Sequence, residues 1–319
     1  MIAAIYTEYG TPDVLKIKVI DTPTPKDHEV LVRVHACTVN RTVDAMLRAK
    51  PFIMRFFTGL LKPSNPVLGV DFAGVVAGVG KDVKAFKVGD RVFGLNDEGV
   101  SSHAQYLTIS YKRVIHMPNE VEFTDAVVGL EGGHYAHNFL NKVRVRPNDK
   151  VLVNGATGAI GSAMVQMLKV HGAHVTAVCG TENVDLVKSL GADVVIDFKK
   201  EDFTKLNTQF KYVFDAVGKS SFAKCKPILK PRGVYMSSEL GWMAENIFLA
   251  IVTPLLGGKR VVFPIPKDCK HSVRYMKQLI EEGSFKPVID RRYTLENIAD
   301  AYRFVATGEK VGSLVVEVE

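Results

Sequence analysis

The chain has 319 residues, of which 47% are hydrophobic and 24% charged, and its formal net charge is +7. These values are ordinary for a soluble protein, and the length leaves room for two domains with cores of their own. The lysines and arginines are scattered and do not form a basic stripe, so we expect no nucleic-acid partner.

The cysteines and apolar runs predict a reduced protein without a membrane partner. The four cysteines are far apart and form no CxxC pair, which argues against a disulfide framework. The longest apolar run, Ile247–Leu256, is interrupted by Thr253 and Pro254 and is shorter than the roughly 20 residues that cross a bilayer. The first residues are typical of a strand and not of a signal peptide. We therefore expect a cytoplasmic location.

The first third of the chain predicts a β-rich region of short strands and turns. Ile2–Thr7 and Glu29–Cys37 alternate between apolar and polar residues, and Phe86–Gly94 is typical of a strand entered by a Gly-Asp turn. Between them, Thr42–Leu61 has a helical composition. This pattern favours a partial β-barrel.

Residues Glu122–Val143 predict one or two helices, and the most informative segment follows them. The apolar run Val151–Val153 predicts a buried parallel strand, after which Gly155, Gly158 and Gly161 open a helix. Glycines at this spacing let the backbone turn tightly and approach a pyrophosphate at the helix N-terminus. The residues of this turn that we expect to bind a dinucleotide are Gly155, Ala156, Thr157, Gly158, Ala159, Ile160 and Gly161.

Further strands and helices alternate after this turn. His174–Cys179, Val194–Asp197, Tyr212–Gly218 and Gly233–Ser238 predict strands, and Val184–Leu190 predicts a helix. This order is typical of an α/β fold with a doubly wound parallel sheet, in which the carboxyl ends of the strands face the ligand. Strand ends expected to contact the cofactor are Cys179, Gly180, Thr181, Ala216, Val217, Gly218, Ser237 and Ser238.

Several motifs together resemble the medium-chain dehydrogenase/reductase superfamily, in its zinc-free quinone oxidoreductase branch. They are the segments Glu29–Ala36, Thr38–Arg41, Asn65–Gly74, Phe86–Gly94, Asn154–Gly161, Phe214–Gly218 and Gly308–Val316. The resemblance implies a GroES-like catalytic domain at residues 1–122, a Rossmann nucleotide-binding domain at 123–264 and a C-terminal return at 265–319 that completes the catalytic domain. It also implies that Lys310, in the closing motif, contacts the cofactor.

The positions that hold catalytic zinc in related alcohol dehydrogenases carry other residues here. Asn40 stands at the first position, Val70 at the histidine position, and Glu131 near the third. An amide and a valine cannot supply the thiolate and imidazole that such a site needs. We therefore expect no zinc.

Without a metal, hydride transfer to an electron-poor acceptor is easier than oxidation of a simple alcohol. Asn40 is the expected catalytic residue: it matches the family's asparagine, and it can donate and accept hydrogen bonds beside the nicotinamide and the substrate. A role in satisfying a tight turn is the alternative that the residues themselves leave open. Asp44 lies one place later than the family's aspartate, so we expect it only to start a helix.

The end of the second strand bears on the choice of cofactor. NAD sites carry an acidic residue there, whereas this chain has Cys179 followed by Gly180 and Thr181. This favours NADPH over NADH, although Glu182 occupies a place where NADPH relatives often have an arginine. Lys188, Lys199 or Lys200 could compensate for it.

The sequence thus predicts an NADPH-dependent reductase of a small quinone or α,β-unsaturated carbonyl, and the family implies a homodimer. Two alternatives stay open: an alcohol or aldehyde oxidoreductase of the same superfamily, and a nucleotide-binding sensor that has lost turnover.

Overall fold

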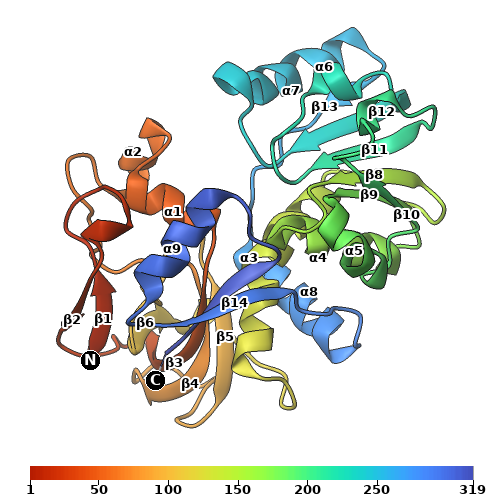
Figure 1. The fold of residues 1–319 in the computed structure, drawn as a ribbon. Coiled ribbons are helices and arrows are strands. Elements are labelled where there is room, and N and C mark those ends of the chain that lie inside the picture. Colours follow the sequence, from red (N-terminus) through yellow and green to blue (C-terminus); the bar gives the residue numbers. More distant parts are fainter. Residues whose placement is uncertain (319) are drawn as a thin grey trace. The chain divides into compact units, whose positions relative to one another are not determined.

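A computed structural model describes residues 1–318, apart from the side chains at positions 53 and 57. The chain forms two compact units (Figure 1). The barrel unit comprises Met1–Glu131, Asp268–Glu281 and the residues from Pro287 onward, and the parallel-sheet unit comprises Gly132–Lys267 and Glu282–Lys286. Among the described residues, no helix has both the length and the apolar character needed to cross a membrane.

The main sheet of the barrel unit joins the two ends of the chain. Its strand order is β14-β15-β3-β4-β5-β7, with β6 also paired to β3, and β1 pairs with β2 separately. The last strand, β15, lies antiparallel to β3 (Figure 1). The strands are β1 (Ile2–Ile5), β2 (Lys16–Val19), β3 (Glu29–Val39), β4 (Asp71–Val79), β5 (Arg91–Leu95), β6 (Tyr106–Ser110), β7 (Val114–His116), β14 (Ile289–Thr294) and β15 (Ser313–Glu317).

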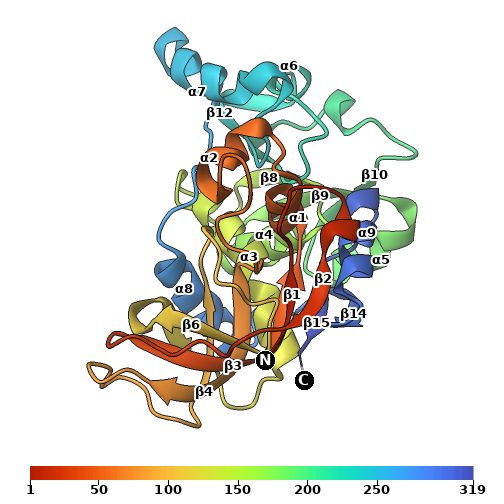
Figure 2. The ribbon, with the colours of Figure 1, turned by 90° about the vertical axis from the view of Figure 1, so that its left-hand side faces the viewer.

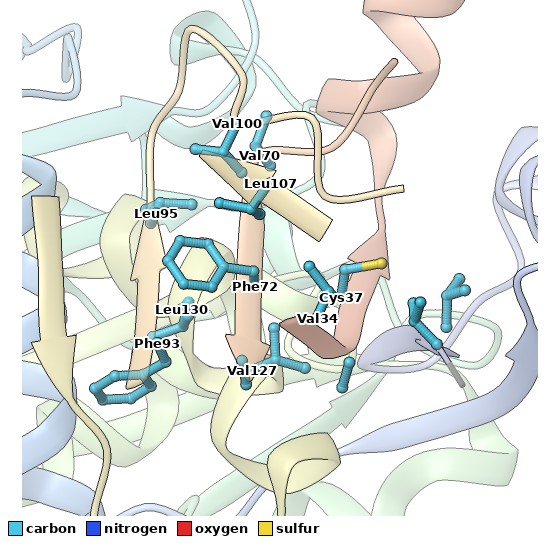
Figure 3. Packing of buried hydrophobic residues seen from close by; sticks show 14 of the residues in the cluster. Val34, Cys37, Val70, Phe72, Phe93, Leu95, Val100, Leu107, Val127 and Leu130 are labelled. Atoms are coloured by element: carbon cyan, nitrogen blue, oxygen red, sulfur yellow. The ribbon is translucent and has the colours of Figure 1, made fainter. Parts of the chain in front are cut away.

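Helices cover this sheet and close its core. Helix α9 packs against α1 (Figure 2). Side chains from β4, β5 and the first half of α3, among them Phe72, Phe93 and Leu130, meet in a fully buried cluster (Figure 3). The helices are η1 (Pro12–Val14), α1 (Arg41–Arg48), η2 (Phe52–Met54), α2 (Arg55–Thr58), η3 (Tyr111–Arg113), α3 (Phe123–Leu140), α8 (Cys269–Glu281) and α9 (Ile298–Thr307).

The parallel-sheet unit has the strand order β10-β9-β8-β11-β12-β13, with every pair parallel. This order, which reverses beside the first strand, confirms the predicted doubly wound Rossmann fold. The strands are β8 (Lys150–Asn154), β9 (His174–Cys179), β10 (Val194–Asp197), β11 (Phe210–Asp215), β12 (Leu229–Ser237) and β13 (Arg260–Val261). The helices are α4 (Ala159–Val170), η4 (Thr181–Asn183), α5 (Val184–Ser189), η5 (Phe203–Lys205), α6 (Phe222–Cys225), η6 (Trp242–Ala244) and α7 (Glu245–Leu256).

The compact units divide the chain at points that differ from the ranges expected from the sequence. The first division falls inside α3, after Glu131. The short segment Glu282–Lys286 belongs to the parallel-sheet unit. The N–H and the carbonyl of its last residue are both hydrogen-bonded to the side-chain amide of Gln166 in α4. Gln166 Oε1 accepts from the Lys286 N–H at 2.7 Å, and its Nε2 donates to the Lys286 carbonyl at 3.1 Å. The functional ranges 1–122, 123–264 and 265–319 stay a prediction.

Candidate functional site

The glycine turn between β8 and α4 is packed so closely that side chains would not fit. Gly155 has φ +76°, in the region that favours glycine. A Cβ on Gly161 would lie 2.1 Å from the carbonyl oxygen of Gly155. Helix α4 starts after Gly158 without any side-chain cap, so its first N–H groups and its positive dipole end are suited to an anion.

A buried aspartate organises the segment after β11. Asp215 Oδ1 accepts hydrogen bonds from the N–H of Gly218 at 2.9 Å and from Asn154 Nδ2 at 3.0 Å. Its Oδ2 accepts from the N–H of Ser220 at 2.9 Å and from the Tyr235 hydroxyl at 3.1 Å. These bonds fix Ala216, Val217 and Gly218 beside the glycine turn. A Cβ on Gly155 would meet the Val217 side chain at 2.7 Å.

Backbone hydrogen bonds join the other strand ends to the same edge of the sheet. The N–H of Ala216 donates to the Asn154 carbonyl, and that of Ser238 donates to the Asp215 carbonyl, both at 3.0 Å. The N–H of Ala156 donates to the carbonyl of Val178, the residue before Cys179, at 3.0 Å. The cofactor residues that the sequence predicted in this unit therefore lie along one edge, at the carboxyl ends of β8, β9, β11 and β12.

The end of β9 carries a set of charges that the sequence only partly predicted. Cys179 is buried, and the Thr181 hydroxyl donates to Asp197 Oδ2 at 2.6 Å. Glu182 pairs with Lys199 at 2.8 Å, and Lys199 is one of the lysines that the sequence offered as compensation. Lys200 lies 3.4 Å from Asp197. The carboxylate of Asp197, at the end of β10, is an acidic group at this corner that the sequence analysis did not assign.

In the barrel unit, Asn40 lies at the start of α1 and is only 4% exposed. Its Nδ2 donates to Thr38 Oγ1 at 2.8 Å and to Glu131 Oε2 at 2.6 Å. Its Oδ1 is buried without a hydrogen-bond partner among the described residues. Because buried polar atoms are usually paired, this oxygen is available to a donor from outside the protein, either a water or a ligand. Asn40 does not cap the helix with its side chain, so the alternative of a purely local turn role is not what the structure shows.

Thr38, two residues before Asn40, is bonded through its backbone and its side chain. Its N–H donates to Asp71 Oδ1 at 2.8 Å, and its hydroxyl donates to Asp71 Oδ2 at 2.6 Å. His103 Nε2 lies 3.2 Å from the Thr38 carbonyl, and its Nδ1 lies 3.2 Å from the Tyr302 hydroxyl. A carbonyl can only accept, so His103 carries its proton on Nε2 and accepts from Tyr302. Burial lowers the pKa of His103 to about 4, which keeps it neutral.

Three further ionisable groups in this cluster have pKa values shifted mainly by loss of hydration, although the Lys310 side chain is only half-buried. Burial and the nearby Glu131 carboxylate raise the pKa of Asp71 to about 7. Burial also raises the pKa of Glu131, against the hydrogen bonds from Thr42 and Asn40. Loss of hydration lowers the pKa of Lys310 to about 8, although Glu131 and Asp290 oppose that shift. Perturbed groups of this kind often gather at functional sites.

Lys310 thus lies within electrostatic reach of Glu131, and its Nζ donates to the Gly312 carbonyl at 2.5 Å. Asp44 lies inside α1 and forms an ion pair with Arg48 at 2.8 Å; the expectation that it starts the helix is wrong, because the helix begins at Arg41 with Asn40 before it. No role for Thr38 was predicted, and Glu131 was considered only as a residue near the third zinc position. The available signal was the presence of single carboxylates, Asp71 and Glu131, inside otherwise apolar or glycine-rich runs.

Two family models match this chain, one in its N-terminal part and one in its C-terminal part. Residues 26–137 match the alcohol dehydrogenase GroES-like domain, and residues 190–316 match a zinc-binding dehydrogenase model. A chloroplastic quinone-oxidoreductase, QR1 of Triphysaria versicolor, is 32% identical over 99% of this chain and 98% of its own length. The chain belongs to the medium-chain dehydrogenase/reductase superfamily, in its quinone oxidoreductase branch.

Other members of this superfamily agree in sequence and in fold. A chloroplastic NADPH-dependent alkenal/one oxidoreductase of Arabidopsis thaliana is 31% identical over 99% of this chain and 79% of its own length. The quinone oxidoreductase structure from Coxiella burnetii superposes with a TM-score of 0.87 at 25% identity, covering 100% of this chain and 99% of that one. This member of the quinone oxidoreductase branch therefore has the two-domain fold of an oxidoreductase family.

Proposed function

We propose that the protein is an oxidoreductase that transfers hydride from NADPH to a quinone or an α,β-unsaturated carbonyl. The observation that carries the proposal is the glycine turn at the start of α4. The Val217 side chain packs against Gly155 of this turn, and Asp215 accepts a hydrogen bond from the N–H of Gly218, the next residue. Near full-length similarity to proteins named as quinone and alkenal/one oxidoreductases supports the acceptor class.

The dinucleotide is held mainly by backbone. The pyrophosphate binds at the uncapped N-terminus of α4, beside Gly155, Ala156, Thr157, Gly158, Ala159, Ile160 and Gly161. The segments Ala216–Gly218 and Ser237–Ser238, at the ends of β11 and β12, bind the remainder of the cofactor. Asn40 and Lys310 of the barrel unit bind its reactive end.

NADPH is the preferred cofactor. Cys179, Gly180 and Thr181 stand where NAD sites carry an acid, and the pairing of Lys199 with Glu182 offsets the glutamate that would repel a 2′-phosphate. Asp197 weakens this preference, because its carboxylate takes the Thr181 hydroxyl. The name of the Arabidopsis relative as NADPH-dependent supports the choice.

Catalysis proceeds without zinc. Val70 has no donor atom, and Asn40 offers only a neutral amide oxygen where such a site uses a thiolate. The residues at the zinc positions of related alcohol dehydrogenases therefore do not fit the metal, even though one matching family model is described as zinc-binding.

When bound, NADPH would supply a hydride to the acceptor, and one proton would complete the two-electron reduction. The protein contributes position and a dry, preorganised environment. The buried Asn40, Thr38 and Asp71 provide fixed dipoles and charges that cannot reorient freely.

The protein acts as a homodimer on small molecules, without nucleic-acid or membrane partners, in the cytoplasm. Among the described residues, β13 pairs only with β12, which leaves one sheet edge open. Beside it, α7 exposes Phe248, Ile251 and Leu255 at 65%, 66% and 83%. An open edge next to an apolar helix face supports self-association. Two relatives are named as chloroplastic, so fractionation must test the location.

The test is the absorbance at 340 nm of chelator-treated protein with NADPH or NADH and a panel of quinones and enones. We expect metal-independent oxidation of NADPH with one acceptor class. Cofactor binding without turnover would favour a sensor, and activity that returns only with zinc would favour an alcohol or aldehyde oxidoreductase.

A further inference from the structure

The hydrogen-bond network around Asn40 leaves its amide with a single kind of free atom. A side-chain amide has two N–H donors and one carbonyl acceptor. Thr38 Oγ1 takes one N–H and Glu131 Oε2 takes the other, at 2.8 and 2.6 Å. What Asn40 can offer a ligand is therefore the unpartnered Oδ1, which accepts and cannot donate.

Asp71 contributes to this orientation through the hydroxyl of Thr38. The Thr38 hydroxyl has one proton and donates it to Asp71 Oδ2 at 2.6 Å, so its oxygen can only accept from Asn40. If the amide turned over, its Oδ1 would face the oxygens of Thr38 and Glu131 with no proton between them. Thr38 itself cannot move aside easily, because its N–H is bonded to Asp71 and its carbonyl to His103.

The chemistry of the reactants identifies the partner of an acceptor at this position. Quinones and enones carry carbonyl oxygens, which also only accept hydrogen bonds. The carboxamide of the nicotinamide ring carries an N–H₂ group that donates. An acceptor oxygen is thus complementary to the cofactor and not to the oxidising substrate.

We propose that Asp71, acting through Thr38, is a positioning residue that orients Asn40 Oδ1 to accept a hydrogen bond from the nicotinamide carboxamide. This inference rests on the proposed function, because it needs a nicotinamide cofactor. It narrows the role expected from the sequence: Asn40 recognises the cofactor and does not donate to the acceptor oxygen.

The experiment compares the affinities of the protein for reduced NADPH and for its reduced 3-acetylpyridine analogue, measured by quenching of protein fluorescence. In the analogue a methyl ketone replaces the amide, so the N–H₂ donor is absent. We expect wild type to bind the analogue about tenfold more weakly, as for the loss of one buried hydrogen bond. Thr38→Val and Asp71→Asn should both reduce this ratio, because Thr38 Oγ1 is then no longer a fixed acceptor for the Asn40 amide and only Glu131 Oε2 holds its orientation.

Thr38→Ser is the matched control, since it keeps the hydroxyl and should keep the tenfold ratio. Adenosine 2′,5′-bisphosphate, which lacks the nicotinamide half, should bind all variants equally. If Thr38→Val does not fold, Asp71→Asn and the wild-type ratio still decide. If NADH is the tighter cofactor, it and its acetylpyridine analogue replace the NADPH pair.

Equal affinity of wild type for cofactor and analogue would overturn the inference alone, as would a Thr38→Val variant that discriminates as well as Thr38→Ser. Failure to bind the bisphosphate and both dinucleotides would overturn the proposed function, and the inference with it.

Discussion

The two polar regions of this molecule are built in different ways. The proposed cofactor edge of the parallel-sheet unit consists of backbone groups and glycines, and Asp215 is a buried side-chain anchor there. The cluster around Asn40 in the barrel unit consists of side chains, with Thr38, Asp71 and Glu131 all at most 5% exposed. Substitutions that add atoms should therefore disrupt the first region. The second region should be disrupted by substitutions that remove a hydrogen-bonding atom and by changes in protonation.

The sharpest way to break the backbone-built region is to add one methyl group. Gly161→Ala should lower the free energy of unfolding by about 3 kcal/mol, as overpacking does, because its Cβ would lie 2.1 Å from a carbonyl oxygen. It should also weaken dinucleotide binding, because the turn must shift. Urea unfolding and a binding titration measure both effects.

Gly158→Ala is the matched control for stability. Its Cβ would meet nothing closer than 3.7 Å, and its φ of −70° suits alanine. We expect its free energy of unfolding to stay within about 1 kcal/mol of wild type. Equal losses in the two variants would mean that close packing of the turn is not what makes it sensitive.

The side-chain cluster should instead respond to pH. The folded pKa of Asp71, about 7, is above its ordinary value of 3.8, so the stability that this group contributes is present in acid and is lost as the pH rises through 7. Asp71→Asn removes that loss. Between pH 5 and pH 8, the free energy of unfolding of the variant should rise by on the order of 2 kcal/mol relative to that of wild type.

Denaturant midpoints at several pH values measure this gain, with Asp202→Asn as the control. Asp202 is exposed, and hydrogen bonds from Thr204 lower its pKa. The stability that the Asp202 carboxylate contributes is therefore lost only in more acid solution. Between pH 5 and pH 8, the free energy of unfolding of this control should change with pH as that of wild type does. If Asp71→Asn also parallels wild type, the carboxyl of Asp71 does not titrate in this range.

The smallest effect is expected at the exposed charges beyond β9. Glu182→Gln removes the carboxylate that pairs with Lys199 and should raise the preference for NADPH over NADH about threefold at low ionic strength, and less in high salt. The ratio of kcat/KM for the two cofactors measures it. Glu245→Gln, at the start of α7 in the other half of the sheet order, should leave that ratio unchanged. An unchanged ratio in Glu182→Gln would show that the charge of Glu182 does not affect the choice between NADPH and NADH.

The sequence by itself determined the fold class and which residues share one edge of the parallel sheet. The strand, the glycine turn and the helix are contiguous, and a parallel sheet brings successive strand ends to one edge whatever the rest of the chain does. That is why the sequence could predict that Gly155–Gly161 and the ends of β9, β11 and β12 lie at one edge of the sheet, while their contact with a cofactor stays a prediction.

Only the tertiary structure decided the chemistry of Asn40. Its partner Glu131 is 91 residues away in the chain, and the aspartate that orients Thr38 is 33 residues away from it. The packing of β3, β4 and α3 selects those partners, and no local pattern encodes which side of an amide faces a ligand. The sequence offered an asparagine able to donate and accept. In the structure both N–H groups of its amide already donate to buried oxygens, so Asn40 can only accept a hydrogen bond from a ligand.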